Sequence, residues 1–170
     1  PNARFSDGKP VTAEDVLYTY QMIQTPDAKS PLAGSWQGIK VETPNKKTIV
    51  FTLPSILSAF PYSMTNGIVP KHLLKDTPPS QLRSSPFNTR NPIGSGPFKW
   101  EAAEVASTNP DTREQRIALV PNADYVSGAP KIDRFIMRSF ADEQRLSDAL
   151  VNREVNAAAG LSSIPESLKN

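Results

Sequence analysis

The sequence FSDGKPVTAEDV, at residues 5–16, sets out a turn followed at once by the start of a helix. An Asp-Gly step tolerates a positive φ, and Pro10 prevents a helix from beginning earlier. Thr12 can cap the amide three residues on, while Asp15 can reach back and place negative charge at the positive end of the helix. Apolar residues then recur at helical spacing up to a Thr-Pro step, so the pattern predicts a helix over residues 13–24.

The composition is that of a folded chain rich in turns. Among its 170 residues are 17 prolines and 8 glycines, together about 15% of the sequence, against the roughly 25–30% that marks a low-complexity chain. Net charge is +2, and no block of five like charges occurs, so nothing in the sequence demands nucleic acid or an anionic membrane. Without cysteine there is no disulfide framework, thiol nucleophile or Cys-rich zinc site.

Short strands and helices alternate irregularly along the rest of the chain. Alternating apolar residues predict a hairpin over residues 39–53, and apolar spacing predicts a short helix around residues 55–62. Four prolines within residues 76–92 mark a long loop or a link between subdomains. We expect strands at residues 98–100 and 116–120, with a polar loop over residues 104–115.

Two further elements are expected in the last third of the chain. Residues 132–140 carry apolar side chains on both faces, which favours a central strand covered on both sides. Asp142 should cap a last helix, whose apolar residues share one face. Helices, hairpins and single strands in this mixture indicate a mixed α+β, or α/β, fold.

Four phrases in order resemble the solute-binding proteins of peptide-type ABC importers, a family that includes the dipeptide-, oligopeptide- and nickel-binding proteins. The phrases are FSDGKPVTAEDV at residues 5–16, IVPKHL at 68–73, PIGSGPF at 92–98, and NADY at 122–125 followed by GAPKID at 128–133. Two departures stand out, because the family usually has Thr where Ser95 stands and Gly-Glu-Val-Asp where residues 153–156 read REVN. A helix cap that favours Gly must therefore use Arg153 or shift by one residue.

The resemblance implies part of a periplasmic-binding-protein type II-like fold, a two-lobed clamp. Residues 1–11 would end the N-terminal segment of the main subdomain, residues 12–91 would form a smaller inserted subdomain of the first lobe, and residues 92–170 would return to the main subdomain. We expect the second lobe to lie outside this chain, which looks like an excised piece.

The function that the resemblance implies is extracytoplasmic solute binding for import. The solute, by default a peptide, would be held between the lobes and delivered to ABC permease subunits in the membrane. We expect an exported, monomeric protein, periplasmic or on the outer face of the cytoplasmic membrane, with no enzymatic activity, no cofactor, no metal and no nucleic-acid partner.

Three residues are candidate ligand contacts: Ser35, Trp36 and Ser95. An indole offers a large contact area and one donor, although Trp36 can equally cover the core of the predicted hairpin. The Gly-Ser-Gly around Ser95 matches neither a phosphate-binding glycine loop nor a nucleophile elbow, and is typical of a tight turn. His72, the sole histidine, more often serves a structural than a metal or acid–base role.

Two other function classes stay open on the sequence alone. The first is a hydrolase or transferase whose catalytic groups lie in sequence outside these residues. The second is a receptor-like module that contacts a membrane partner without transport. A signal peptide or lipidated cysteine before residue 1 and a second lobe after residue 170 would separate them from an importer subunit.

Overall fold

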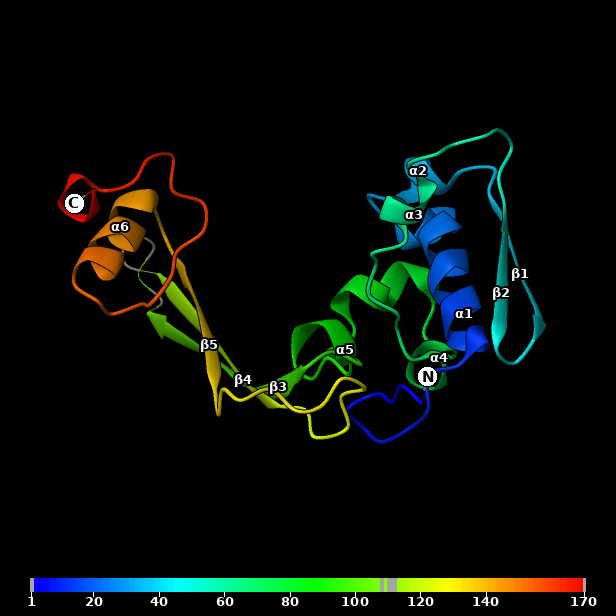
Figure 1. The fold of residues 1–170 in the computed structure, drawn as a ribbon, viewed down its shortest axis with the longest axis horizontal. Coiled ribbons are helices and arrows are strands. Elements are labelled where there is room, and N and C mark those ends of the chain that lie inside the picture. The colour runs from blue at the N-terminus through cyan, green and yellow to red at the C-terminus, as the bar shows by residue number, and fades with distance from the viewer. Residues whose placement is uncertain (1, 108, 110–112, 170) are drawn as a thin grey trace. The chain divides into compact units, whose positions relative to one another are not determined.

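The structure, a computed structural model, describes residues 2–107, 109 and 113–169. The chain divides into two compact units: unit 1 comprises residues 1–100 and 120–133, and unit 2 comprises residues 101–119 and 134–170. The fold is mixed α/β, as predicted (Figure 1). These units are bounded differently from the predicted subdomains, residues 12–91 and 92–170, and the place of those subdomains in a larger lobe stays a prediction.

Helix α1, Ala13–Gln24, organises unit 1, and its start confirms the predicted capping box. The Asp15 carboxylate accepts from the Thr12 amide at 2.9 Å and from the Thr12 hydroxyl at 2.7 Å. Its other oxygen accepts from the amide of Lys71 at 2.9 Å, the first residue of helix α4, Lys71–Leu74. Asp15 is 5% exposed, so these bonds replace the water that a buried carboxylate loses.

Helix α1 packs on an antiparallel hairpin, confirming the strands expected over residues 39–53 (Figure 1). The hairpin consists of β1, Lys40–Asn45, and β2, Thr48–Thr52. Between helix and hairpin lies an aromatic cluster in which the Tyr20 and Trp36 ring centroids are 4.1 Å apart. Phe51 and Phe60 complete it, each at edge or tilted geometry to Trp36. This cluster is the core of unit 1.

The remaining elements of unit 1 are short. The helix predicted around residues 55–62 begins only at Phe60, which is buried, because Ile56 and Leu57 before it are exposed and bury no helical face. The proline-rich stretch predicted as a loop contains a 3₁₀ segment and one helical turn, each with a proline in its first turn. The short elements are η1 (Pro26–Ala28), α2 (Ala33–Trp36), α3 (Phe60–Ser63), η2 (Pro79–Ser84) and α5 (Pro86–Thr89).

Strands β3, Phe98–Ser107, β4, Glu114–Pro121, and β5, Phe135–Phe140, form a sheet in the order β3-β4-β5. The predicted loop over residues 104–115 was wrong at both ends, because β3 runs on to Ser107 and β4 begins at Glu114. Residues 101–105 are exposed, and a strand with exposed residues tolerates the polar side chains that suggested a loop.

Within the described sheet, residues 132–140 do not have the predicted central position. Strand β5 lies at the edge of the described sheet and pairs antiparallel with β4. Ile136 is 53% and Met137 51% exposed, although neighbouring residues of a strand point to opposite faces. The apolar pattern indicates burial, but these two side chains are half exposed in the described part of the chain.

Helix α6, Glu143–Val151, is the last α-helix of the described chain and is capped at both ends. Asp142 accepts from the amide of Arg145 at 2.8 Å, as predicted. At the other end Arg153 has φ 60°, its amide donates to the Leu150 carbonyl at 3.1 Å, and the Glu154 amide donates to the Ala149 carbonyl at 2.8 Å. This is a Schellman cap, so Arg153 occupies the position that favours glycine. A last 3₁₀ segment, η4, spans Glu166–Leu168.

We predict that Arg153→Gly raises the free energy of unfolding by about 1 kcal/mol, because glycine adopts a left-handed conformation without the cost that an L side chain incurs. Asn152→Gly is the matched control, since Asn152 has φ −76°, and should lower stability or leave it unchanged. Urea unfolding followed by circular dichroism measures both. Equal effects of the two substitutions would contradict the assignment.

A second prediction concerns the buried carboxylate. Asp15→Asn keeps one acceptor oxygen but loses the charge at the helix start, and should cost about 1–3 kcal/mol of stability. Asp27→Asn, at an exposed carboxylate in η1, should change stability by less than about 0.5 kcal/mol. If thermal unfolding shows equal small effects, Asp15 does not hold α1 and α4 together.

Candidate functional site

The four sequence phrases meet in unit 1 through a series of hydrogen bonds. The Ser6 amide donates to the Gly94 carbonyl at 2.8 Å, which joins the first phrase to the third. Asn122, 2% exposed, joins the third to the fourth: its amide donates to the Pro97 carbonyl at 2.8 Å and its side chain to the Gly96 carbonyl at 2.9 Å. Hydrogen bonds therefore fix the backbone both before and after Ser95.

The first and second phrases meet around the only histidine. His72 Nε2 lies 2.7 Å from Asp7 Oδ2, and its ring meets the edge of the fully buried Phe5 ring at a centroid distance of 5.9 Å. Burial opposes ionisation of Asp7, but the hydrogen bonds with His72 and from the Lys9 amide outweigh it and lower the pKa of the Asp7 carboxyl. The predicted structural role of His72 fits this contact.

The three predicted ligand contacts lie in different environments. Trp36 is 2% exposed and belongs to the aromatic core, Ser35 is exposed on α2, and Ser95 is half-buried before β3. Among the described residues, no hydrogen bond joins Ser95 to either of the other two. A ligand contact at any of the three stays a prediction.

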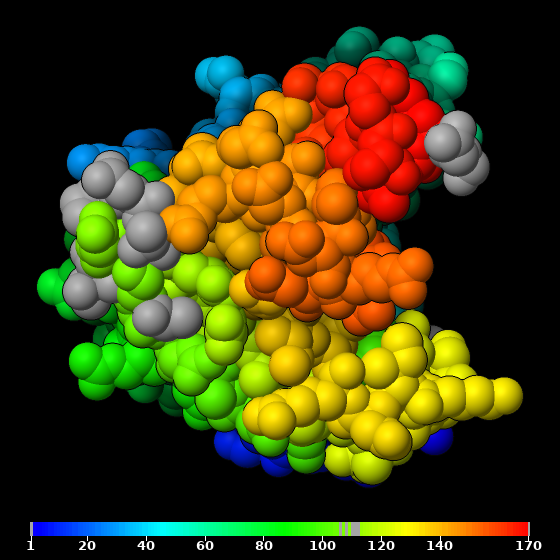
Figure 2. Space-filling view, turned by 90° about the vertical axis from the view of Figure 1, so that its left-hand side faces the viewer, coloured from blue at the N-terminus to red at the C-terminus, as the bar shows by residue number. Residues whose placement is uncertain are grey.

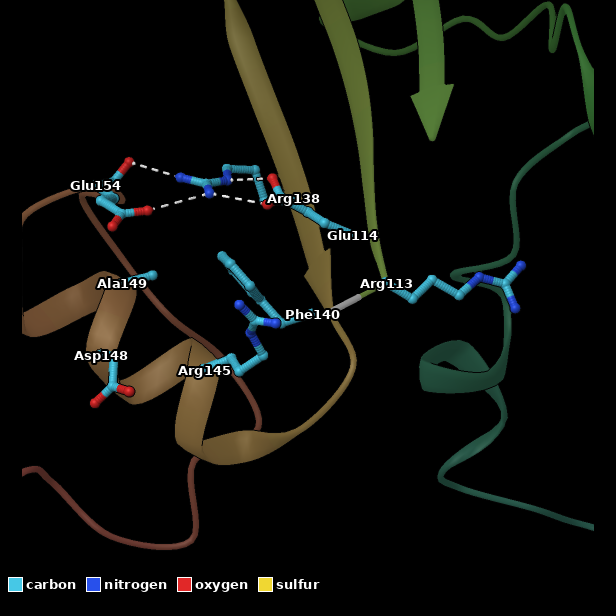
Figure 3. A pocket seen from close by; sticks show the side chains of 8 residues that line it. All are labelled: Arg113, Glu114, Arg138, Phe140, Arg145, Asp148, Ala149 and Glu154. Carbon is cyan, nitrogen blue, oxygen red and sulfur yellow. Dashed lines mark hydrogen bonds and ion pairs between the residues drawn. The ribbon is translucent and has the colours of Figure 1, made fainter. Parts of the chain in front are cut away.

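Unit 2 contains a cavity of about 150 Å³ that the sequence did not single out (Figure 3). It lies between the sheet and helix α6, and it is lined mainly by charged residues: Arg113, Glu114, Arg138, Phe140, Arg145, Asp148, Ala149 and Glu154. The Arg113 side chain extends away from the others in Figure 3. The lining holds as many carboxylates as guanidinium groups, so it favours neither an anion nor a cation.

Arg138 connects the two sides of this cavity. It donates from Nε and Nη2 to the Glu114 carboxylate at 2.7 and 3.1 Å, and from Nη1 and Nη2 to the carbonyl and the carboxylate of Glu154 at 3.2 and 3.3 Å (Figure 3). Its guanidinium lies 4.9 Å from the centroid of the Phe140 ring. The hydrogen bonds of Arg138 thus link β5 to β4 and to the turn after α6.

The strand register explains the position of Glu114. Arg116 on β4 lies directly opposite Arg138 on β5, and like charges in that position repel. Glu114 Oε1 accepts from Nε of both guanidinium groups, at 2.6 and 2.7 Å. The hydrogen bonds from Arg138 and then from Arg116 lower the pKa of Glu114 to about 2, although burial opposes this.

The charged residues around Arg138 pair with one another. Within the part of the chain that the structure describes, no three acidic or histidine side chains gather closely enough to hold a metal ion. Glu114, Arg116 and Arg138 satisfy one another, as the ion pairs of a structural network do. No described helix is long and apolar enough to cross a bilayer.

Comparison with known proteins decides the family. Residues 1–169 match the model of the bacterial extracellular solute-binding proteins, family 5 (middle). The chain belongs to this family. Among relatives found by sequence, a Brucella ovis protein named provisionally as an ABC transporter peptide-binding protein is 33% identical over 159 residues, covering 91% of this chain and 28% of the relative. Oligopeptide-binding protein AppA of Bacillus subtilis is 30% identical over 156 residues, covering 90% of this chain and 27% of AppA.

Solved structures of similar proteins agree in fold. The structure of AppA in complex with a nonapeptide superposes with a TM-score of 0.75 at 30% identity, covering 91% of this chain and 30% of AppA. NikZ of Campylobacter jejuni in complex with Ni(L-His) gives a TM-score of 0.74 at 26% identity, covering 91% of this chain and 29% of NikZ. The chain therefore spans about 30% of the length of these relatives, and its periplasmic-binding-protein type II-like fold is confirmed as a part of theirs.

The Glu114 network predicts a pH dependence of stability. Because the pKa of Glu114 is lower in the folded than in the unfolded state, its contribution is complete above about pH 4.5 and is lost as the pH falls towards about 2. The free energy of unfolding of the wild type should exceed that of Glu114→Gln by about 1–2 kcal/mol at pH 6, allowing for screening at Arg116, whose side chain is 42% exposed. Urea unfolding at pH 6 and pH 2.5 measures the difference, and an equal difference at both would contradict the prediction.

Proposed function

We propose that this chain is part of an extracytoplasmic solute-binding protein that serves an ABC importer. One observation carries the proposal: sequence and fold match proteins solved with bound solutes over 91% of the chain. Those solutes are a nonapeptide for AppA and Ni(L-His) for NikZ. Peptide is the first candidate for this chain, because relatives found by sequence are named for peptide or oligopeptide binding.

The mechanism we propose is ligand-stabilised closure of two lobes. These residues supply part of the first lobe, and polypeptide outside them supplies the second. A solute that contacts both lobes favours their closed arrangement by its differential affinity, and the membrane permease recognises that arrangement. No bond of the solute is broken, the protein acts outside the cytoplasm, and it works as a monomer.

Within unit 1 we propose Ser35 and Ser95 as polar contacts to the solute. Ser35 is exposed on α2, whose position is fixed by the burial of its neighbour Trp36. Ser95 is fixed by the bonds from Ser6 and Asn122 to the residues beside it. Trp36 itself, being buried, would act through the position of Ser35. Rigid support of this kind is what a binding residue needs.

Thermal unfolding of the full-length gene product tests this function. The protein is unfolded in the presence of each member of a panel of peptides, metal chelates and sugars. A compound that binds only the folded protein, present at a concentration of 100 times its Kd, should raise the free energy of unfolding by about 2.7 kcal/mol. Catalytic turnover of any panel compound would contradict the transport function. The 170 residues alone should show no tight binding, and sub-micromolar affinity for a peptide by calorimetry would overturn the two-lobed site.

The residue assignment has its own test. Once a ligand is found, Ser35→Ala and Ser95→Ala in the full-length protein should each weaken its affinity by about 2- to 10-fold, the effect of one lost hydrogen bond. Ser58→Ala, at another exposed serine of unit 1, is the matched control and should leave affinity unchanged. Calorimetric titrations that give all three variants wild-type affinity would exclude both serines.

A further inference from the structure

Asn66 is the one asparagine of the sequence that a glycine follows. It lies between α3 and α4, in a stretch without helix or strand (Figure 1). After any asparagine, the backbone nitrogen of the next residue can reach the carboxamide carbon and close a five-membered ring, as an intramolecular nucleophile held close to its target. A glycine has no Cβ to hinder that approach. The sequence thus favours ring closure at Asn66 over every other asparagine.

The structure leaves both reacting groups accessible. Gly67 is exposed, and its amide donates no hydrogen bond to any residue that the structure describes. A Cβ built at Gly67 would meet no atom within 4 Å, so open space adjoins this nitrogen. The Asn66 side chain donates from Nδ2 to the Ser63 carbonyl at 3.0 Å, and water can replace an exposed hydrogen bond of this kind at little cost. Neither group is therefore held in a contact that prevents ring closure.

An exposed asparagine of unit 2 offers a matched case without the glycine. Asn156 lies in the segment after α6, which faces the viewer in orange and red in Figure 2. Asn156 is exposed, and the Ala157 amide that follows it also donates to no described residue. The Cβ of Ala157 is the main difference between this step and Asn66–Gly67. Asn156 is therefore an internal control for the effect of the glycine.

We propose that Asn66 is a site of spontaneous deamidation. The Gly67 nitrogen attacks Asn66 Cγ; the N–Cγ bond forms, the Cγ–Nδ2 bond breaks, and the Gly67 amide proton leaves with Nδ2 as ammonia. Water then opens the cyclic imide. Cleavage of the new bond gives aspartate, whereas cleavage of the original peptide bond gives isoaspartate, whose main chain runs through Cγ and is one atom longer. The balance is one water taken up and one ammonia released, without oxidation or reduction.

The longer main chain of the isoaspartate product acts on the contacts that follow it. The Ile68 side chain packs against the aromatic core, and the Val69 amide donates to the Thr19 hydroxyl of α1 at 3.0 Å. Pro70, the next residue, is fully buried. Because these residues are fixed on α1, an extra backbone atom at residue 66 displaces them from their partners. Isoaspartate formation thus loosens the junction between α1 and α4, whether or not a solute is bound.

Peptide mapping by mass spectrometry tests the site on the full-length gene product incubated at pH 8. Residue 66 should gain about 1 Da, the difference between an amide and an acid. This gain should be at least about tenfold faster than at Asn156, which corresponds to about 1.4 kcal/mol on the barrier. Gly67→Ala should slow it by about the same factor, and the open space at Gly67 accommodates the methyl group. Equal rates at the two asparagines, or an unchanged rate in Gly67→Ala, would overturn the proposal.

Hydrogen exchange at the Val69 amide tests the structural effect. In the isoaspartate form, separated from the incubated protein, this amide should exchange about tenfold faster than in fresh protein, because its bond to Thr19 opens more often. Asn66→Asp is the matched control, since it adds the same charge without lengthening the main chain, and should keep the exchange slow. Equal exchange in the isoaspartate form and in fresh protein would show that the α1–α4 junction does not depend on the backbone at residue 66.

Discussion

A single buried carboxylate, that of Asp15, holds together the parts of unit 1. Its two oxygens receive three hydrogen bonds, two from Thr12 at the start of α1 and one from the first amide of α4. Ionised groups are costly to bury unless such bonds replace water, and the positive end of α1 adds a favourable charge. Thr19 reinforces the same junction, because its hydroxyl donates to the Asp15 carbonyl at 2.8 Å and accepts from the Val69 amide at 3.0 Å.

The four sequence phrases are joined to one another by hydrogen bonds at this junction and beyond it. Asp15 and Asp7 of the first phrase contact Lys71 and His72 of the second, and Ser6 bonds to the third. Asn122, from the fourth, completes the series at Gly96 and Pro97. The phrases are therefore the residues whose polar groups join distant segments of unit 1, and these bonds are the support that the proposed contact at Ser95 needs.

Sequence reasoning succeeded where the signal is local. The capping residues predicted α1 and α6, and alternation predicted the hairpin. The sequence left open whether the helix cap uses Arg153 or shifts by one residue, and the structure has the left-handed residue at Arg153. Sequence reasoning failed at β5, because an apolar pattern indicates burial but not whether the covering polypeptide lies within the same residues. The Glu114 network was also missed, since it depends on the register that places Arg116 opposite Arg138, which no local pattern fixes.

We propose that the intact protein carries a solute without changing it. The most direct measurement is to incubate the full-length gene product with a mixture of peptides, isolate the complex, and determine the masses of the peptides that denaturation releases. We expect peptides of unaltered mass, retained by the full-length protein and not by the 170-residue chain. Cleaved or modified peptides would contradict it.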